Sequence, residues 1–365
     1  MRHPTIIPAV NKRTVLLRRE FVAPSLVYVL YTSLGAPAHA AKFLVRWVCA
    51  WRRTALVLLL ASLPLAAPAQ AVDEWAEIES VVVRERPGPA LWHLTRGDSE
   101  VWILGMPGAP LPQGLDWNRQ YLSDLFDGAR AILMPPRPNV ALTDIVWFLI
   151  RHGSEMSLPR GQVLEQTLPD DLRTRFIAAR DAVGGDESDY RTDIPIRAAM
   201  RLWQNMMKKA NLSFEEPRKT ISDLADHKDI PAKPILRFDG MMDAFRDVLK
   251  LTPEQQRVCL GQRAEDVTWA LAHAEKAGRA WAVGDLKTMK ANYGEDRFGN
   301  CIVTAVKAMG DIGVRNNADI VAAIDVALNQ PGKTIALVPV GALLSKGGVL
   351  EQLDARHIAI EGPAD

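Results

Sequence analysis

After about the first ninety residues, hydrophobic and polar positions predict a short series of strands and one helix. Residues 90–94 and 101–104 are short apolar runs on either side of a polar turn at residues 96–98, a pattern typical of a β-hairpin. Apolar positions at helical spacing predict a helix over residues 117–129. A third strand is predicted over residues 131–134, where two prolines end the apolar run.

Helical periodicity dominates the middle of the chain. It predicts an insertion of helices over residues 139–230, a strand over residues 233–238, and a second series of helices that follows. Residues 334–340 form an apolar strand, and residues 357–360 form a short last strand. Strands at both ends with helices between them indicate an α/β (α+β) fold, in which N- and C-terminal strands form one mixed sheet.

The first 71 residues differ from the rest in charge and pattern. They hold nine Lys or Arg and one acid, whereas the remainder has 35 basic and 42 acidic residues, a net charge of −7. Residues 52–71 contain a pair of arginines, an apolar run and the ending Ala69-Gln70-Ala71, which are the parts of a secretory signal peptide. We expect cleavage after Ala71, a single mature domain over residues 72–365, and a periplasmic or secreted protein.

An uncleaved membrane anchor is the alternative, but a spanning helix needs about 20 apolar residues, and this run is shorter and contains Pro64. A weaker copy of the leader pattern begins at Arg18-Arg19. One hypothesis is that residues 1–44 are not translated. The acidic body has no basic tract of the kind that binds phosphates, so we expect no nucleic-acid partner.

Removal of the leader takes Cys49 with it and leaves Cys259 and Cys301 as the cysteines of the mature chain. Two cysteines in an exported protein predict a disulfide, with two buried free thiols as the alternative. The chain has no CxxC and no HExxH motif, which excludes a thiolate zinc site and a zincin helix. We expect no cofactor.

Both ends of the mature chain resemble the TraB/GumN family, the relatives of PrgY and of the TIKI metalloproteases. At one end the resemblance rests on residues 89–105 and 111–117, and at the other on Arg315-Asn316 and on residues 335–342 and 347–350. In that family each end supplies a strand, a glycine at its tip and a histidine three positions later. The resemblance implies a divalent metal, held by two imidazoles and by carboxylates, that activates water.

Both histidine positions hold other residues in this chain. The first motif is Gly105-Met106-Pro107-Gly108, and the second is Gly341-Ala342-Leu343-Leu344. Neither Gly108 nor Leu344 has a side chain that binds a metal. We therefore predict a non-catalytic relative that keeps a crevice for binding or scaffolding, formed by Gly105, Gly108, Gly341 and Leu344, with Trp117 at its mouth.

Three other residues are candidates for chemistry at this crevice. Asp239 matches a family Glu, but it equally fits a helix N-cap before Met241. Arg315 matches a family Arg, which binds an anion or forms a structural ion pair, and Asp116 is an acid near the first motif. The competing hypothesis is an active periplasmic metal-dependent hydrolase or peptidase, with a site rebuilt from such residues and from His357.

The sequence leaves the ligand or partner open among a periplasmic protein, a peptide and a polysaccharide. A role in polysaccharide export is implied by the family resemblance alone. Contact with a membrane is expected only through an uncleaved leader, because the rest of the chain contains no apolar run long enough to span one.

Overall fold

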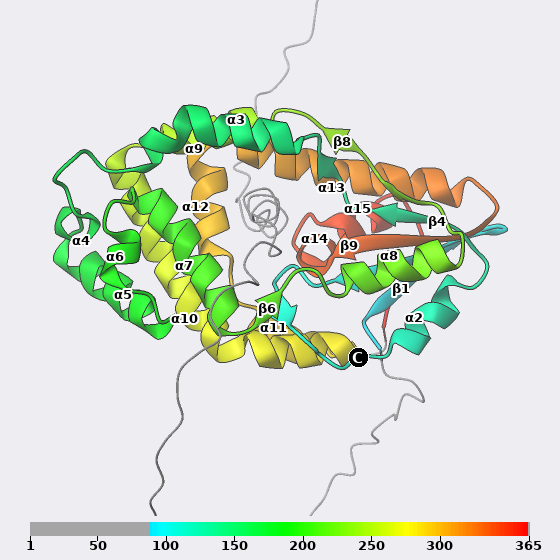
Figure 1. Ribbon diagram of the computed structural model, residues 1–365. Coiled ribbons are helices and arrows are strands. Elements are labelled where there is room, and N and C mark those ends of the chain that lie inside the picture. Colours follow the sequence, from blue (N-terminus) through cyan, green and yellow to red (C-terminus); the bar gives the residue numbers. More distant parts are fainter. Residues whose placement is uncertain (1–87, 364–365) are drawn as a thin grey trace, which may run out of the picture. The chain divides into compact units, whose positions relative to one another are not determined.

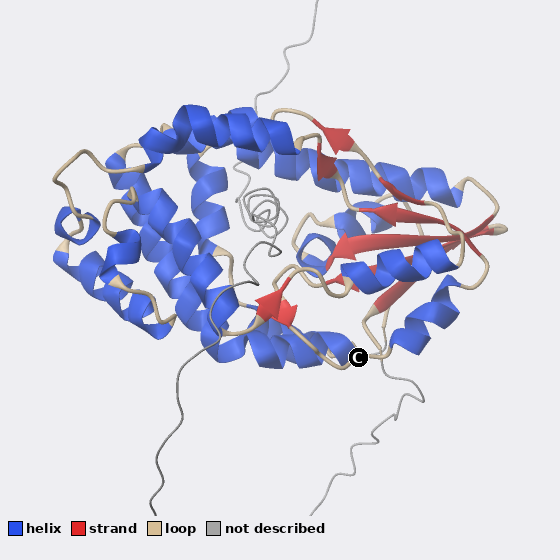
Figure 2. Ribbon diagram, viewed as in Figure 1, coloured by secondary structure: helices blue, strands red, loops and turns tan. Residues whose placement is uncertain are grey.

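A six-stranded mixed sheet lies between two layers of helices in the computed structural model, which describes residues 88–363 (Figure 1, Figure 2). The strands lie in the order β10 (Ile360–Glu361), β1 (Leu91–Arg96), β2 (Ser99–Met106), β9 (Gly332–Pro339), β4 (Ala129–Met134) and β7 (Ala232–Pro234). Neighbours from β2 to β7 are parallel, whereas β1 is antiparallel to both β2 and β10. The two ends of the chain therefore form one mixed sheet, which confirms the predicted fold class.

Side chains that alternate along the central strands supply two cores. On β9, Ile335 and Leu337 belong to one core, and Ala336 and Val338 belong to the other, because successive side chains of a strand point to opposite faces. The first core is covered by α2 (Arg119–Phe126), α8 (Arg218–His227), α11 (Leu286–Tyr293) and the end of α10 (Pro253–Val283). The second core is covered by α13 (Lys307–Leu328), α14 (Val340–Leu344) and α15 (Val349–Asp354).

A third core lies among helices that come between β4 and β9 in the sequence. These elements are α3 (Leu142–His152), η1 (Gly153–Met156), α4 (Leu164–Thr167), α5 (Asp170–Ala182), α6 (Glu187–Tyr190), α7 (Pro195–Lys209), α9 (Met241–Leu249), the first part of α10, and α12 (Arg297–Ala305). The predicted insertion over residues 139–230 supplies part of this core, and later helices complete it. Helix α10 has 31 residues and runs from this core to the sheet (Figure 1).

Two pairs of very short strands accompany the main sheet. β3 (Leu111–Pro112) pairs with β6 (Leu212–Ser213), and β5 (Arg137–Pro138) pairs with β8 (Arg237–Phe238). The strand predicted over residues 233–238 is therefore split between β7 and β8, which belong to different sheets. Pro234 ends β7, since a proline has no N–H to continue a ladder.

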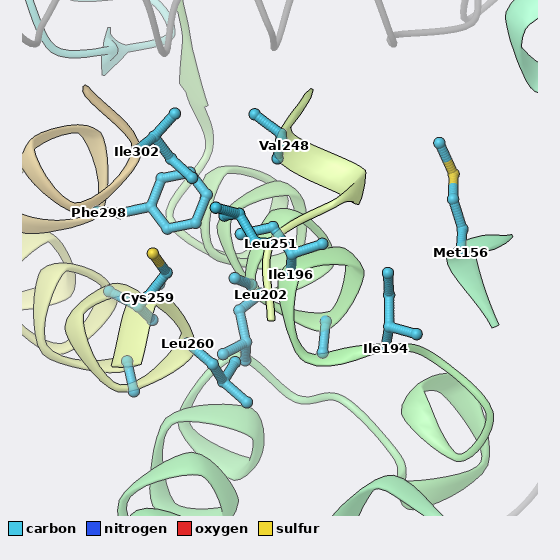
Figure 3. Close-up of a cluster of buried hydrophobic side chains, with 14 of the residues drawn as sticks. Met156, Ile194, Ile196, Leu202, Val248, Leu251, Cys259, Leu260, Phe298 and Ile302 are labelled. Atoms are coloured by element: carbon cyan, nitrogen blue, oxygen red, sulfur yellow. The ribbon is translucent and has the colours of Figure 1, made fainter. Parts of the chain in front are cut away.

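The disulfide between Cys259 and Cys301 is present and joins α10 to α12. The two Cα atoms lie 5.5 Å apart and the cysteines are 42 residues apart in sequence. Cys259 lies in the helical core with Phe298 and Ile302, two side chains of α12 (Figure 3). The prediction of a disulfide is confirmed, so the bond fixes α12 against the long helix.

None of the helices within residues 88–363 is long and apolar enough to cross a membrane. The predicted leader, its cleavage after Ala71 and the hypothesis of a later start all lie outside the residues that the structure describes.

Candidate functional site

The two glycine motifs lie at the ends of neighbouring strands. β2 and β9 pair in parallel, with Gly105 opposite Val338 and Met106 opposite Pro339. The loop that follows β2 and the helix α14 that follows β9 therefore leave the sheet at the same edge. This is the carboxyl edge, outside which open α/β sheets bind their ligands.

Close packing explains the glycine at the end of β2. A Cβ atom on Gly105 would lie 2.9 Å from Trp92 Cζ3 and 2.9 Å from Val340 Cγ2, a distance that real side chains do not adopt. The carbonyl oxygen of Gly105 also accepts a 2.8 Å hydrogen bond from Trp281 Nε1 on α10. Gly105 thus lets α14 pack closely against the strand and ties the strand tip to the long helix.

A cavity of about 130 Å³ lies beside these strand tips, and both Gly108 and Gly341 line it. Helices α10 and α11 and the segment before α12 supply most of the remaining wall. The wall is largely apolar, and its aromatic members are Trp203, Phe214, Trp269, Trp281 and Tyr293. The charged residues of the wall are Arg263, Asp266, Glu295 and Asp296.

A buried ion pair forms part of this wall. Arg263 is 2% exposed, and its Nη1 lies 3.6 Å from Asp266 Oδ2. The guanidinium also lies 4.5 Å from the ring centroid of Trp203 and 4.0 Å from that of Phe298. Burial lowers the pKa of Arg263, because the cation loses its hydration, and the charge of Asp266 opposes this change. The aromatic rings add cation–π attraction to the ion pair.

Asp266 connects this ion pair to the start of α12. Its two carboxylate oxygens accept hydrogen bonds from the backbone N–H groups of Arg297, at 3.2 Å, and Phe298, at 2.9 Å. Burial raises the pKa of Asp266, while Arg263 and the two N–H groups lower it. The carboxylate therefore satisfies free N–H groups at a helix N-terminus, where negative charge is stabilised.

Asp296 is the N-cap of the same helix. One of its oxygens accepts a 2.8 Å hydrogen bond from the backbone N–H of Gly299. Burial raises the pKa of Asp296 to about 6, with Asp266 adding to the rise and Arg263 opposing it. This carboxyl group therefore titrates closer to neutrality than an ordinary aspartate.

We expect Asp296 to make the stability of the protein depend on pH. Because its pKa is higher in the folded than in the unfolded state, its stabilising contribution is full near pH 4 and is lost as the pH rises through about 6. Asp296→Asn keeps an oxygen for the cap and removes the titration. From pH 4 to pH 7 the wild type should lose on the order of 1–3 kcal/mol relative to this variant. Urea unfolding at both pH values measures the difference, and a difference that does not change with pH would contradict the expectation.

Three polar atoms of cavity residues are buried without a partner in full hydrogen-bond geometry among the described residues. They are Trp203 Nε1, Arg263 Nε and the hydroxyl of Tyr293. Burial raises the pKa of Tyr293, and the backbone amide of Gly108 acts in the opposite direction. Each of the three atoms is a hydrogen-bond donor. Since buried polar groups are nearly always bonded, this wall offers donors that lack acceptors.

The residues predicted to form the crevice do not all reach the cavity. Gly108 and Gly341 line it, whereas Leu344 lies at the far end of α14 and is 47% exposed. Trp117 is not among the lining residues; it is buried in the core beside the sheet, with its ring 5.4 Å from that of Trp281. Trp117 supports the wall from behind instead of standing at the mouth.

Asp116 and Asp239, the two acidic candidates, lie outside the lining of the cavity. Asp116 is exposed, and the N-cap of α2 is Asn118. Asp239 accepts a 3.0 Å hydrogen bond from the side chain of Asn139, and Gly240 occupies the N-cap position of α9. The alternative N-cap role of Asp239 is therefore wrong; its carboxylate joins the segments after β5 and β8.

Arg315 and His357 are also exposed and do not line the cavity. Arg315 Nε donates to the backbone carbonyl of Asp311 at 3.3 Å. Within residues 88–363, no group of three or more His, Cys, Asp or Glu side chains is placed to hold a metal ion. Gly108 and Leu344 add no donor, so the residues at the strand tips do not fit the metal that the resemblance implies.

Sequence reasoning missed the four polar residues that give the cavity its character: Arg263, Asp266, Tyr293 and Asp296. Arg263 and Asp266 belong to a strongly polar stretch of α10, which is typical of a solvated face. A weak signal existed in the Gly294-Glu295-Asp296 run, because a glycine followed by acids before an apolar segment indicates a helix start. Gly294 has φ +70°, and a Cβ there would lie 2.6 Å from the Trp269 ring.

The comparison with known families agrees with the resemblance read from the two ends of the chain. A sequence model of the TraB/PrgY/gumN family matches residues 90–362, which include both strand tips and every residue of the cavity wall. No curated protein and no solved structure matches the chain. The family match covers well over half of the 365 residues. The chain therefore belongs to the TraB/PrgY/gumN family.

Proposed function

We propose that this protein is an exported, non-catalytic member of its family that binds a ligand in the cavity beside the two strand tips. The observation that carries this proposal is the chemistry of the tips. Gly108 and Gly341 contribute backbone to the wall of an apolar cavity, and the side chains around it are hydrogen-bond donors and aromatic rings. Ligand sites of proteins have this composition, with apolar walls and a few placed polar groups.

Two features of the chain support export to the periplasm or out of the cell. The leader of residues 52–71 has the charge, length and ending of a signal peptide. The disulfide between Cys259 and Cys301 is of a kind that persists in oxidising compartments. The expected partner is a molecule of that compartment, such as a peptide, a polysaccharide or another protein.

The rival function is a metal-dependent hydrolase that uses a rebuilt site. It requires at least three donor side chains around one point, and the residues at the strand tips do not supply them. The carboxylates closest to the cavity, Asp266 and Asp296, each bond to the backbone at the start of α12. We therefore assign them a structural and electrostatic role in ligand binding.

Metal analysis distinguishes the two functions. We expect the purified protein, after dialysis, to contain far less than one equivalent of zinc, manganese or cobalt, and its melting temperature to be unchanged by a chelator, because a bound metal stabilises only a fold that holds it. A sample without chelator is the control. One equivalent of metal, or a melting temperature that falls by several degrees with chelator, would favour the hydrolase.

A further inference from the structure

The size and lining of the cavity limit what it holds. Its volume of about 130 Å³ is close to that of an apolar protein cavity of about 150 Å³ that binds benzene. Rings of Trp203, Trp269, Trp281 and Tyr293 form much of its wall. The cavity therefore suits one aromatic ring or a branched aliphatic group, and a longer ligand would place one such group inside.

The unpartnered donors add a polar requirement. Trp203 Nε1, Arg263 Nε and the Tyr293 hydroxyl are all buried, and Arg263 as a whole is 2% exposed. An unmet buried donor costs free energy that an acceptor on a ligand would restore. A purely apolar ligand leaves all three unmet, so the group in the cavity should carry an acceptor atom.

The charge of the wall decides between a charged and an uncharged acceptor. Arg263 is the one cation among the lining residues, and Asp266 already faces it at 3.6 Å. Glu295 and Asp296 add two further acids, so a second carboxylate would meet net repulsion. A cationic group would suit the acids but would face three donors and a guanidinium.

From these observations we infer that the cavity binds an uncharged apolar group of about one ring that carries a hydrogen-bond acceptor, such as the carbonyl of an amide. This inference rests on the proposed binding function and specifies its ligand. The acceptor bonds to the free donors, while the ring packs against the tryptophans. Asp266 and Asp296 hold α12 in place and keep competing anions out of the cavity.

Four probes that share one ring test the inference by calorimetric titration of the purified full-length protein. They are benzamide, toluene, benzoate and benzylamine. Benzamide should bind about tenfold more tightly than each of the other three, since it alone is uncharged and has a carbonyl acceptor. Equal affinity for toluene, or tighter binding of either charged probe, would overturn the assignment.

Two variants place the binding and identify a donor. Ala274→Leu adds bulk to the lining and should abolish binding of benzamide, whereas the exposed Val314→Leu on α13 should leave it unchanged. Tyr293→Phe removes one free donor and should weaken benzamide several-fold with no loss for toluene. Binding of benzamide that survives Ala274→Leu would put its site elsewhere and overturn the inference.

The outcomes also separate this inference from the proposed function. If no probe binds and the protein contains no stoichiometric metal, the ligand assignment is wrong while the non-catalytic role stands. If the protein holds one equivalent of metal, the proposed function itself is wrong.

Discussion

Replacement of both Cys259 and Cys301 by serine should lower the free energy of unfolding by about 4 kcal/mol. The estimate follows from the 42-residue separation, because a cross-link of that length restricts the unfolded chain. The two helices that it joins, α10 and α12, carry most of the charged residues of the cavity. The variant should therefore lose stability and also bind ligand more weakly.

Urea unfolding of the wild type and the double variant measures the loss of stability. A reductant should destabilise the wild type to a similar extent and should leave the double variant unchanged. A loss below about 1 kcal/mol would mean that the bond constrains the unfolded chain much less than its length suggests.

Arg263→Met should cost about 3 kcal/mol at pH 8. Removal of one member of a buried ion pair leaves the other charge without compensation, and this is more costly than the loss of the pair itself. Asp266 would remain buried, with only the N–H groups of Arg297 and Phe298 as partners. Methionine retains a similar length, so the loss reports the charge more than the volume.

Two controls make this prediction specific. The charge of Arg263 lowers the pKa of Asp266, so the variant should raise this pKa further. Protonation should then relieve the cost, and the loss of stability should be smaller at pH 5 than at pH 8. Arg257→Met, on the same helix, removes a surface pair with Glu254 and should cost at most about 1 kcal/mol. Similar losses for both variants, or a loss independent of pH, would contradict the buried-charge explanation.

The strands of the sheet were predictable because their pattern is local. Residues 334–340 are apolar throughout, and β9 is buried on both faces between two cores. The end of α10 was less predictable. The sequence suggests a helix that stops at Ala277, but α10 continues through Gly278, where a Cβ would lie 2.8 Å from Pro112 Cδ. That glycine serves close packing, and the helix ends at Gly284, which has φ +73°.

The cavity was not predictable for a different reason. Its charged residues lie in segments whose composition is typical of solvent-exposed helices, and only the packing of α10 against α12 and α7 buries Arg263. The glycine motifs indicated the correct edge of the sheet, because Gly105 and Gly341 follow strand-like text. Burial of a charge depends on which segments meet in three dimensions, and hydrophobic periodicity does not report this.

The pairing of β2 with β9 has a consequence for folding. Met106 and Pro339 are neighbours in the sheet although almost the whole domain separates them in sequence. A contact of such high sequence separation forms late, because a very long loop must close first, whereas local helices form quickly. The edge that carries Gly108 and Gly341 therefore does not exist in any fragment that ends before residue 332, and ligand binding should appear only in the last stage of folding.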